Sequence, residues 1–267
     1  MRKITIKGKN YFVPGDWNEM TAEQLCFLAV ILTQRCTVQE AKLKMLLFCL
    51  RGRIRAYRRA TGNGYAVSLP GMNVYLTPEQ LTVLSAVYDF LFCETDKGCD
   101  LDIRLTRNPF PVYVLKDRTL AGPEDGLTNV SYGQFIMLQS WQQQMKSDFN
   151  TALDNFLSVI WKDGNFTISE DGPADLFKEV DPAVKTVMFW FFLGSMRFIQ
   201  EKFSRVFPGT GDSGGGDIFD IQQRIVDEMA SGDVTKKEQV KHCLLYDALY
   251  TLEMAIERDE KMKQRNK

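Results

Sequence analysis

The stretch "MTAEQLCFLAVIL", Met20 to Leu32, opens with a phrase that recurs twice along the chain. Near copies begin at Leu76, as "LTPEQLTVL", and at Val130, as "VSYGQFIML". Each copy has an apolar residue, a Thr or Ser, two further residues, a Gln and another apolar residue. This order is typical of a capping box with a hydrophobic staple, in which the hydroxyl and the Gln side chain accept hydrogen bonds from backbone amides of the first turn. We therefore interpret the phrase as the start of a helix and not as a binding site.

Three boxes are strong and two are weaker. The predicted caps and their partners are Thr21 with Gln24, Thr77 with Gln80, Ser131 with Gln134, and, less completely, Thr37 with Glu40 and Thr235 with Glu238. The predicted staples pair Met20 with Leu25, Leu76 with Leu81, and Val130 with Phe135. The residues between the copies do not match, which favours independent helix starts over duplication of one unit.

The N-terminal half mixes predicted hairpins with helices. Residues 3–14, "KITIKGKNYFVP", alternate like a hairpin with its turn at Gly8-Lys9-Asn10. Helices are predicted over 22–34, 38–51 and 78–92, and "GNGYAVSLPGMNVYL" predicts strands with turns at Gly62, Gly64 and Pro70-Gly71. "CETDKGCD" is typical of a loop, and "LDIRLTRNPFPVYVLK" of an edge or irregular strand, because two prolines interrupt it.

The C-terminal half is predicted to be a helical bundle. Helices are expected over 131–146, 149–161, 182–206, 218–230 and 236–260, with a turn and strand at 162–173. The helix at 182–206 is apolar on nearly every face, which places it in the core or in an oligomer interface, and the last helix has an apolar stripe for earlier helices or for a partner helix. We predict an α+β, predominantly α-helical protein with subdomains 1–122 and 123–267 and a flexible Gly/Ser linker at 208–216.

The composition is that of an average globular protein. The chain has 267 residues, 45% hydrophobic and 25% charged, and a net charge of −1, which argues against a protein coated in positive charge for wrapping DNA. The start has no continuous apolar core, and the longest apolar run is too short to span a bilayer. The six cysteines lie mostly in apolar helical patterns, so we expect a protein of the reducing cytoplasm without disulfides.

Several patterns resemble catalytic or metal sites but lack essential parts. "GDSGGG" around Ser213 resembles the nucleophile loop of chymotrypsin-like proteases, but the only histidine, His242, follows it inside a predicted helix. "CETDKGC" has five residues between its cysteines, more than a zinc knuckle allows, and the acidic cluster of Asp96, Asp100 and Asp102 lacks the pattern of a calcium loop. We expect no enzyme, no cofactor and no metal.

One basic block stands out, "RGRIRAYRRATGNG", with Arg51, Arg53, Arg55, Arg58 and Arg59 around Tyr57. Three interpretations remain open. The arginines could be the solvated end of a helix, where cations favour the dipole. They could bind an acidic protein surface, or they could bind the phosphates of a nucleic acid.

Three segments resemble small proteins of bacteriophage tail gene clusters. "YFVPGDWNEMTAEQLCFLAVILT", Tyr11 to Thr33, is similar to their start, where a β segment leads through a Pro and a Trp to a helix. "LTNVSYGQFIMLQSW", Leu127 to Trp141, and "MASGDVTKKEQVKHCLLYDALYTLEM", Met229 to Met254, are similar to later helix starts in such proteins. Together the segments cover about a quarter of the chain.

The resemblance implies a phage or prophage tail-assembly chaperone or a related structural accessory protein. Such proteins act by binding: they coat a tape-measure protein and recruit tail-tube subunits in the cytoplasm of the bacterial host, and some are associated with the virion. Partners would be other tail or structural proteins, with a homo-oligomer and, as the alternative function, nucleic acid still open. With the basic block, the expected partner-binding residues are Trp17, Phe27, Arg51, Arg53, Arg55, Arg58 and Arg59.

Overall fold

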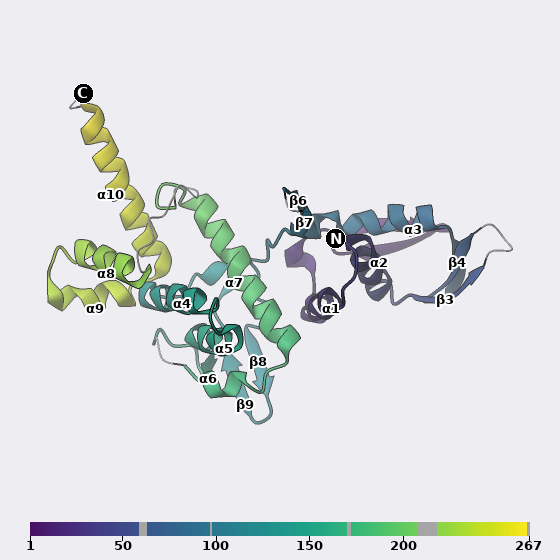
Figure 1. The fold of residues 1–267 in the computed structure, drawn as a ribbon, viewed down its shortest axis with the longest axis horizontal. Helices are drawn as coiled ribbons and strands as arrows, with labels where there is room; N and C mark the ends of the chain where they lie inside the picture. The colour runs from purple at the N-terminus through teal and green to yellow at the C-terminus, as the bar shows by residue number, and fades with distance from the viewer. Residues whose placement is uncertain (59–62, 97, 170–171, 208–217, 266–267) are drawn as a thin grey trace. The chain divides into compact units, whose positions relative to one another are not determined.

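The computed structural model describes residues 1–58, 63–96, 98–169, 172–207 and 218–265. The chain divides into two compact units, Met1–Leu105 and Thr106–Lys267, which we call the N-terminal and the C-terminal unit and describe separately (Figure 1). Helices predominate, and the strands pair into small antiparallel sheets. The expected α+β, predominantly helical fold is therefore confirmed.

The N-terminal unit alternates hairpins and helices. Its elements are β1 (Arg2–Ile6), β2 (Lys9–Val13), η1 (Trp17–Glu19), α1 (Ala22–Thr33), α2 (Val38–Cys49), β3 (Arg53–Arg58), β4 (Gly64–Leu69), β5 (Met72–Leu76), α3 (Pro78–Ser85), η2 (Ala86–Leu91), β6 (Phe92–Thr95) and β7 (Gly98–Leu101). Strands β1 and β2 form one hairpin, β3, β4 and β5 a three-stranded sheet with β4 in the middle, and β6 and β7 a second hairpin.

The first hairpin turns earlier than its sequence pattern suggests. Ile6 pairs with Lys9, so the turn is Lys7-Gly8, and both residues have positive φ, 49° and 81°. A two-residue turn with positive φ at both positions matches the right-handed twist of the strands that it joins. The glycine adopts this conformation without a steric cost.

The loop expected at "CETDKGCD" is instead the β6–β7 hairpin, in which Phe92 pairs with Leu101 and Thr95 with Gly98. Its polar residues made it look like a loop, but they are exposed on the hairpin. The hydroxyl of Thr95 donates to the carboxylate of Asp100 at 3.1 Å. The loop prediction is wrong because a short exposed hairpin has no apolar face to signal it.

The three strong capping boxes are confirmed. In α1 the amide of Gln24 donates to the Thr21 hydroxyl at 3.2 Å, and the amide of Thr21 donates to the Gln24 side chain at 2.9 Å. The same reciprocal pair begins α3 and, in the C-terminal unit, α4 (Tyr132–Gln144), and the weaker box of Thr37 also forms, at the start of α2. All six staple residues are buried: Met20, Leu25, Leu76, Leu81, Val130 and Phe135.

The remaining elements of the C-terminal unit are β8 (Val112–Leu115), β9 (Arg118–Ala121), η3 (Asp125–Leu127), α5 (Phe149–Ile160), β10 (Lys162–Asp163), α6 (Ala174–Phe177), α7 (Pro182–Lys202), α8 (Ile218–Met229), α9 (Val234–His242) and α10 (Leu245–Arg265). Strands β8, β9 and β10 form an antiparallel sheet with β9 in the middle. The linker expected at 208–216 and Ser213 lie outside the described residues.

The boundary between the units lies earlier than the expected one after residue 122, because the sheet ties residues 106–122 to the helices that follow. Lys162 of β10 pairs with Ala121 of β9. The indole N–H of Trp161 donates to the carbonyl of Phe110 at 3.0 Å. Trp161 and Leu120 are both fully buried, so this sheet shares the core of the C-terminal unit.

Helix α7 is buried along its middle, as its apolar sequence suggests. Phe192 packs edge-on against Phe156 of α5, with ring centroids 4.7 Å apart, and Phe191 packs against Trp161 at 6.2 Å. Near the start of α7, the ammonium of Lys185 meets the carboxylate of Asp154 at 2.8 Å, with both side chains mostly buried. Aromatic packing and this ion pair together join α7 to α5 (Figure 1).

The helix expected over 236–260 is two helices, α9 and α10. Asp233, not Thr235, caps α9 and accepts a hydrogen bond from the Thr235 amide at 3.0 Å. The break falls at Cys243, whose carbonyl accepts from the amide of Tyr132 at 2.9 Å, while the amide of Leu245 donates to the carbonyl of Val130 at 2.8 Å. The start of α4 therefore takes the backbone groups that a continuous helix would use.

No helix among the described residues is long and apolar enough to cross a membrane.

Candidate protein-binding surface

Three arginines of the basic block, Arg53, Arg55 and Arg58, lie on strand β3. Helix α2 ends at Cys49, and the chain reverses through Arg51, which has a φ of 50°. The amide of Gly52 donates to the carbonyl of Leu47 at 2.7 Å. A Cβ on Gly52 would lie 2.8 Å from the Cδ2 atom of Leu69, so a larger residue here would require the Leu69 side chain to shift. The interpretation as a solvated helix end is therefore wrong for Arg53 and Arg55, which lie on β3, whereas Arg51 is in the turn that directly follows α2.

Strand β3 is an edge of the three-stranded sheet. Arg53 pairs with Ser68 and Ile54 with Val67, and a bulge at Arg55 shifts the register before Ala56 pairs with Ala66. Charged side chains and bulges on an edge strand discourage pairing with other strands. Side chains of β3, rather than its backbone, are therefore the groups that it offers to a partner.

We define the β3 surface as Arg51, Arg53, Ile54, Arg55 and Tyr57. All five residues are exposed, and the two apolar ones keep large exposed fractions, 41% for Ile54 and 47% for Tyr57. Among the described residues, no carboxylate pairs with any of the three arginines. Arg58 ends β3, where the structure describes only its backbone, and Arg59 lies outside the described residues.

The β3 surface combines two kinds of recognition. A guanidinium donates hydrogen bonds in a fixed fork that matches a carboxylate or a phosphate. The ring of Tyr57 is held by that of Tyr65 on β4, with centroids 5.1 Å apart, so it is presented as a positioned apolar surface. Tyr and Arg are also the residues that contribute most to protein–protein binding energy.

The other two expected partner-binding residues lie in different surroundings. Trp17 is only 1% exposed and belongs to the core of the N-terminal unit. Phe27 of α1 is half-buried and stacks on Phe48 of α2, with ring centroids 4.0 Å apart and an interplanar angle of 8°. Both residues thus hold the N-terminal unit together.

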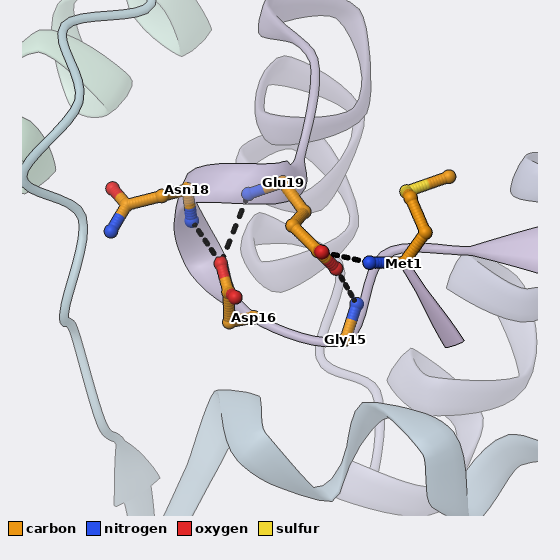
Figure 2. A network of polar contacts seen from close by, with 5 residues as sticks. All are labelled: Met1, Gly15, Asp16, Asn18 and Glu19. Atoms are coloured by element: carbon orange, nitrogen blue, oxygen red, sulfur yellow. Dashed lines mark hydrogen bonds and ion pairs between the residues drawn. The ribbon is translucent and has the colours of Figure 1, made fainter.

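The turn that carries Trp17 is fixed by two carboxylates (Figure 2). Asp16 accepts hydrogen bonds from the amides of Asn18 and Glu19, at 2.8 and 3.0 Å. Glu19 accepts from the amide of Gly15 at 2.7 Å and pairs with the amino group of Met1. These carboxylates satisfy the amides between β2 and α1, so this phage-like segment has a structural explanation.

Sequence reasoning missed a groove of about 400 Å³ in the N-terminal unit. Its walls come from the β1–β2 hairpin, the end of β5 and α3, and it is lined by Thr5, Ile6, Lys7, Leu76, Glu79, Gln80, Val83 and Leu84. The feature of the sequence that could have indicated this groove is Val83, which is 74% exposed. An apolar residue on the solvent side of α3 departs from the usual pattern of a helix with a polar outer face. The lining holds no nucleophile beside a base.

The protease-like pattern around Ser213 lies outside the described residues, and the other patterns are placed as follows. No group of three or more His, Cys, Asp or Glu side chains among the described residues lies close enough to hold a metal ion. His242 is exposed at the end of α9, where its ring nitrogen Nδ1 lies 2.7 Å from the carbonyl of Glu238. Asp102 pairs with Arg104 at 2.9 Å.

Cys49 ends α2 and Cys243 follows α9, and the pKa of each thiol is changed by burial. Burial raises the pKa of the Cys49 thiol and that of the Cys243 thiol above the ordinary value, which favours the protonated form of both. All six cysteines are free thiols.

Comparison of the chain with protein-family models, with curated proteins and with solved structures gives no match.

Proposed function

We propose that this chain is a non-enzymatic assembly protein of a phage or prophage tail, a chaperone that acts by binding other proteins through the β3 surface. The partner's complementary surface is acidic with an apolar centre. The tail assignment rests on the sequence resemblance in three segments, Tyr11–Thr33, Leu127–Trp141 and Met229–Met254. On this proposal the protein works in the cytoplasm of the bacterial host while tails are built.

The single observation that carries the binding role is the exposure of Arg53, Arg55, Ile54 and Tyr57 on one edge strand, with Arg51 just before it, where no carboxylate of the described residues pairs with these arginines. An arginine is well solvated in water, but the exposed parts of Ile54 and Tyr57 lose a fraction of the roughly 1.5–3 kcal/mol that full burial of a large apolar side chain contributes. A protein partner that covers the β3 surface recovers that free energy.

Protein is favoured over nucleic acid as the partner for two reasons. The net charge of −1 provides no broad positive field to attract a phosphate backbone. The apolar side chain of Ile54 has no use in a phosphate contact, whereas it suits the desolvated centre of a protein interface.

The experiment is complementation of a deletion. The reading frame is deleted from the phage or prophage that carries it, and particles are examined by electron microscopy after supply of the wild-type protein or of the Arg53→Glu/Arg55→Glu variant. We expect tailless particles without the protein, tailed particles with the wild type, and at least about a tenfold loss of tailed particles with the variant, since like charges across an interface cost several kcal/mol.

The matched control is Lys3→Glu/Lys146→Glu, which makes the same charge change at two other exposed cations and should restore tails fully. Normal tails in the deletion strain would refute the assembly role. A gel-shift assay with duplex DNA tests the alternative function: binding that falls steeply with salt and is lost in Arg53→Glu/Arg55→Glu would replace the protein partner by nucleic acid.

A further inference from the structure

The charges of the N-terminal unit are separated along its sequence. Residues 41–78 contain no Asp or Glu, and their cations are Lys42, Lys44, Arg51, Arg53, Arg55, Arg58 and Arg59. Residues 79–102 contain one cation, Lys97, which lies outside the described residues, and their acids are Glu79, Asp89, Glu94, Asp96, Asp100 and Asp102. The basic segment supplies the β3 surface, and the acidic segment supplies the β6–β7 hairpin.

The β6–β7 hairpin carries carboxylates around a small apolar side chain. Glu94, Asp96, Cys99 and Asp100 are all exposed on it, and we call these four residues the hairpin surface. Cys99 pairs across the hairpin with Glu94 and directly precedes Asp100. A free Cys behaves as a small hydrophobic residue. The hairpin surface is therefore acidic with an apolar centre, which is the character that the β3 surface requires of a partner.

The cations near the base of the hairpin are already paired. The ammonium of Lys42, which lies 5.6 Å from the centre of the Phe92 ring, pairs with Asp89 at 2.7 Å. Arg104 pairs with Asp102 at 2.9 Å. Among the described residues, no cation pairs with a carboxylate of the hairpin surface. These carboxylates therefore remain available to the guanidinium groups of another molecule.

The β3 surface and the hairpin surface lie apart within the N-terminal unit. Strands β3 and β4 extend toward one end of this unit, the β6–β7 hairpin lies toward its other end, and α3 and η2 come between them in the chain (Figure 1). The two surfaces of one unit therefore cannot meet while the unit keeps its fold. Contact between them requires two molecules.

We propose that the acidic partner of the β3 surface is the hairpin surface of a second copy of this chain, so that copies associate head to tail. This inference rests on the binding role proposed above for the β3 surface and names its partner. Guanidinium groups of one copy meet carboxylates of the next, and Ile54 and Tyr57 lie against Cys99 of the next copy. Because each copy keeps one surface free, the association continues beyond a dimer into a ring or a filament.

Sedimentation velocity of the full-length chain over a series of protein concentrations tests the proposal. In about 0.05 M salt, where charges are weakly screened, the wild type should pass from monomer through dimer to larger species as its concentration rises. The variants Arg53→Glu/Arg55→Glu and Glu94→Lys/Asp96→Lys each set like charges together. Each should raise the dissociation constant about tenfold or more.

An equimolar mixture of these two variants should associate, although neither variant does so alone at the same concentration. Every contact between the two variants sets opposite charges together, whereas contact between two copies of one variant sets like charges together. A single chain with all four substitutions has both surfaces reversed in sign and should also associate. Recovery in the mixture shows at the same time that both variants are folded.

The matched control is Asp117→Lys/Asp259→Lys, which makes the same charge change at two exposed carboxylates of the C-terminal unit and should associate like the wild type. A wild type that stays monomeric at every concentration would overturn the proposal. Association of Glu94→Lys/Asp96→Lys that equals that of the wild type would overturn it as well.

The complementation experiment separates this inference from the proposed function. Tails lost with Arg53→Glu/Arg55→Glu while the wild type is monomeric would support the proposed function and overturn the second copy as the partner. Normal tails in the deletion strain, with the wild type associating and the mixture recovering, would refute the assembly role and support head-to-tail association.

Discussion

Thr21 and Ser131 hold the same position in the same capping box, but their surroundings differ. Thr21 is exposed at the start of α1, whereas Ser131 is 1% exposed at the start of α4. Its partner Gln134 is fully buried, and the side-chain amide of Gln134 also donates to the carbonyl of Val159 at 3.0 Å. The box of α1 therefore begins a helix, and that of α4 also joins α4 to α5.

Replacing each cap should separate these two roles. Thr21→Ala should cost about 1 kcal/mol of the free energy of unfolding of the N-terminal unit, because water replaces the lost acceptor. Ser131→Ala should cost about 2 kcal/mol of the free energy of unfolding of the C-terminal unit, because the backbone amide of Gln134 is left buried without the Ser131 hydroxyl as its acceptor. Native-state hydrogen exchange in α1 and α4 measures both costs. Equal costs would contradict a role for burial. On the proposed function, Thr21→Ala should leave tail assembly intact.

The residue types of Pro14 and Trp17 do not by themselves show whether these side chains pack in the chain's own core or against a partner. They flank the first phrase and carry much of the phage resemblance, which made Trp17 an expected contact. Both are buried in the N-terminal unit. The identity of an aromatic residue indicates that it will be buried against something, but only the packing decides whether this is its own core or a partner.

At the scale of elements, α2 differs from the other boxed helices because its box closes with a Glu. The pKa of Glu40 is lowered from its ordinary value by the hydrogen bond from the Thr37 amide and then by that from the Thr37 hydroxyl. A carboxyl group whose pKa is lowered on folding stabilises the protein above its unfolded-state pKa and loses this effect as the pH falls through the folded value. The Gln boxes of α1, α3 and α4 do not titrate.

The start of α2 should therefore loosen in acid before the start of α1. As the pH falls below about 4, amide exchange in the first turn of α2 should speed up relative to α1, after correction for intrinsic rates. Glu40→Gln keeps a box of the neutral kind and should abolish the difference. If the difference persists in Glu40→Gln, the titration of Glu40 is not its cause.

Elements that depend on distant backbone were the ones that sequence patterns placed wrongly. The apolar stripe over 236–260 is continuous, yet α9 and α10 separate because Cys243 and Leu245 bond to the backbone at the start of α4. The arginines of β3 could extend α2 by propensity, but the chain reverses at Arg51, which has a φ of 50°, and continues as a strand that pairs with β4. A local pattern carries no information on partners that lie far along the chain.

At the scale of the molecule, residues 106–122 decide where the C-terminal unit begins. They supply β8, β9 and the carbonyl of Phe110 that accepts from Trp161. Leu120 is fully buried in that unit. The Gly- and Pro-rich stretch at 121–129 looks like a linker, but it follows directly on a strand of the sheet.

Two fragments test this boundary. Fragment 106–267 keeps the sheet, whereas 123–267 loses β8 and β9 and exposes the surface that Leu120 covers. We expect the shorter fragment to be less stable by at least about 2 kcal/mol, the value of burying one leucine. Urea denaturation followed by tryptophan fluorescence measures the difference, and equal stability would place the boundary after residue 122.

The sequence by itself determined the fold class and the three strong helix starts, and each of these starts depends on contacts within a few residues, such as Thr21 with Gln24. It also located the basic block. Tertiary structure alone decided that Arg53 and Arg55 lie on an edge strand, that Trp17 is in the core, and that the last helical stripe is two helices. Each of these depends on groups brought together from distant parts of the chain, and their burial decides which side chains remain for a partner.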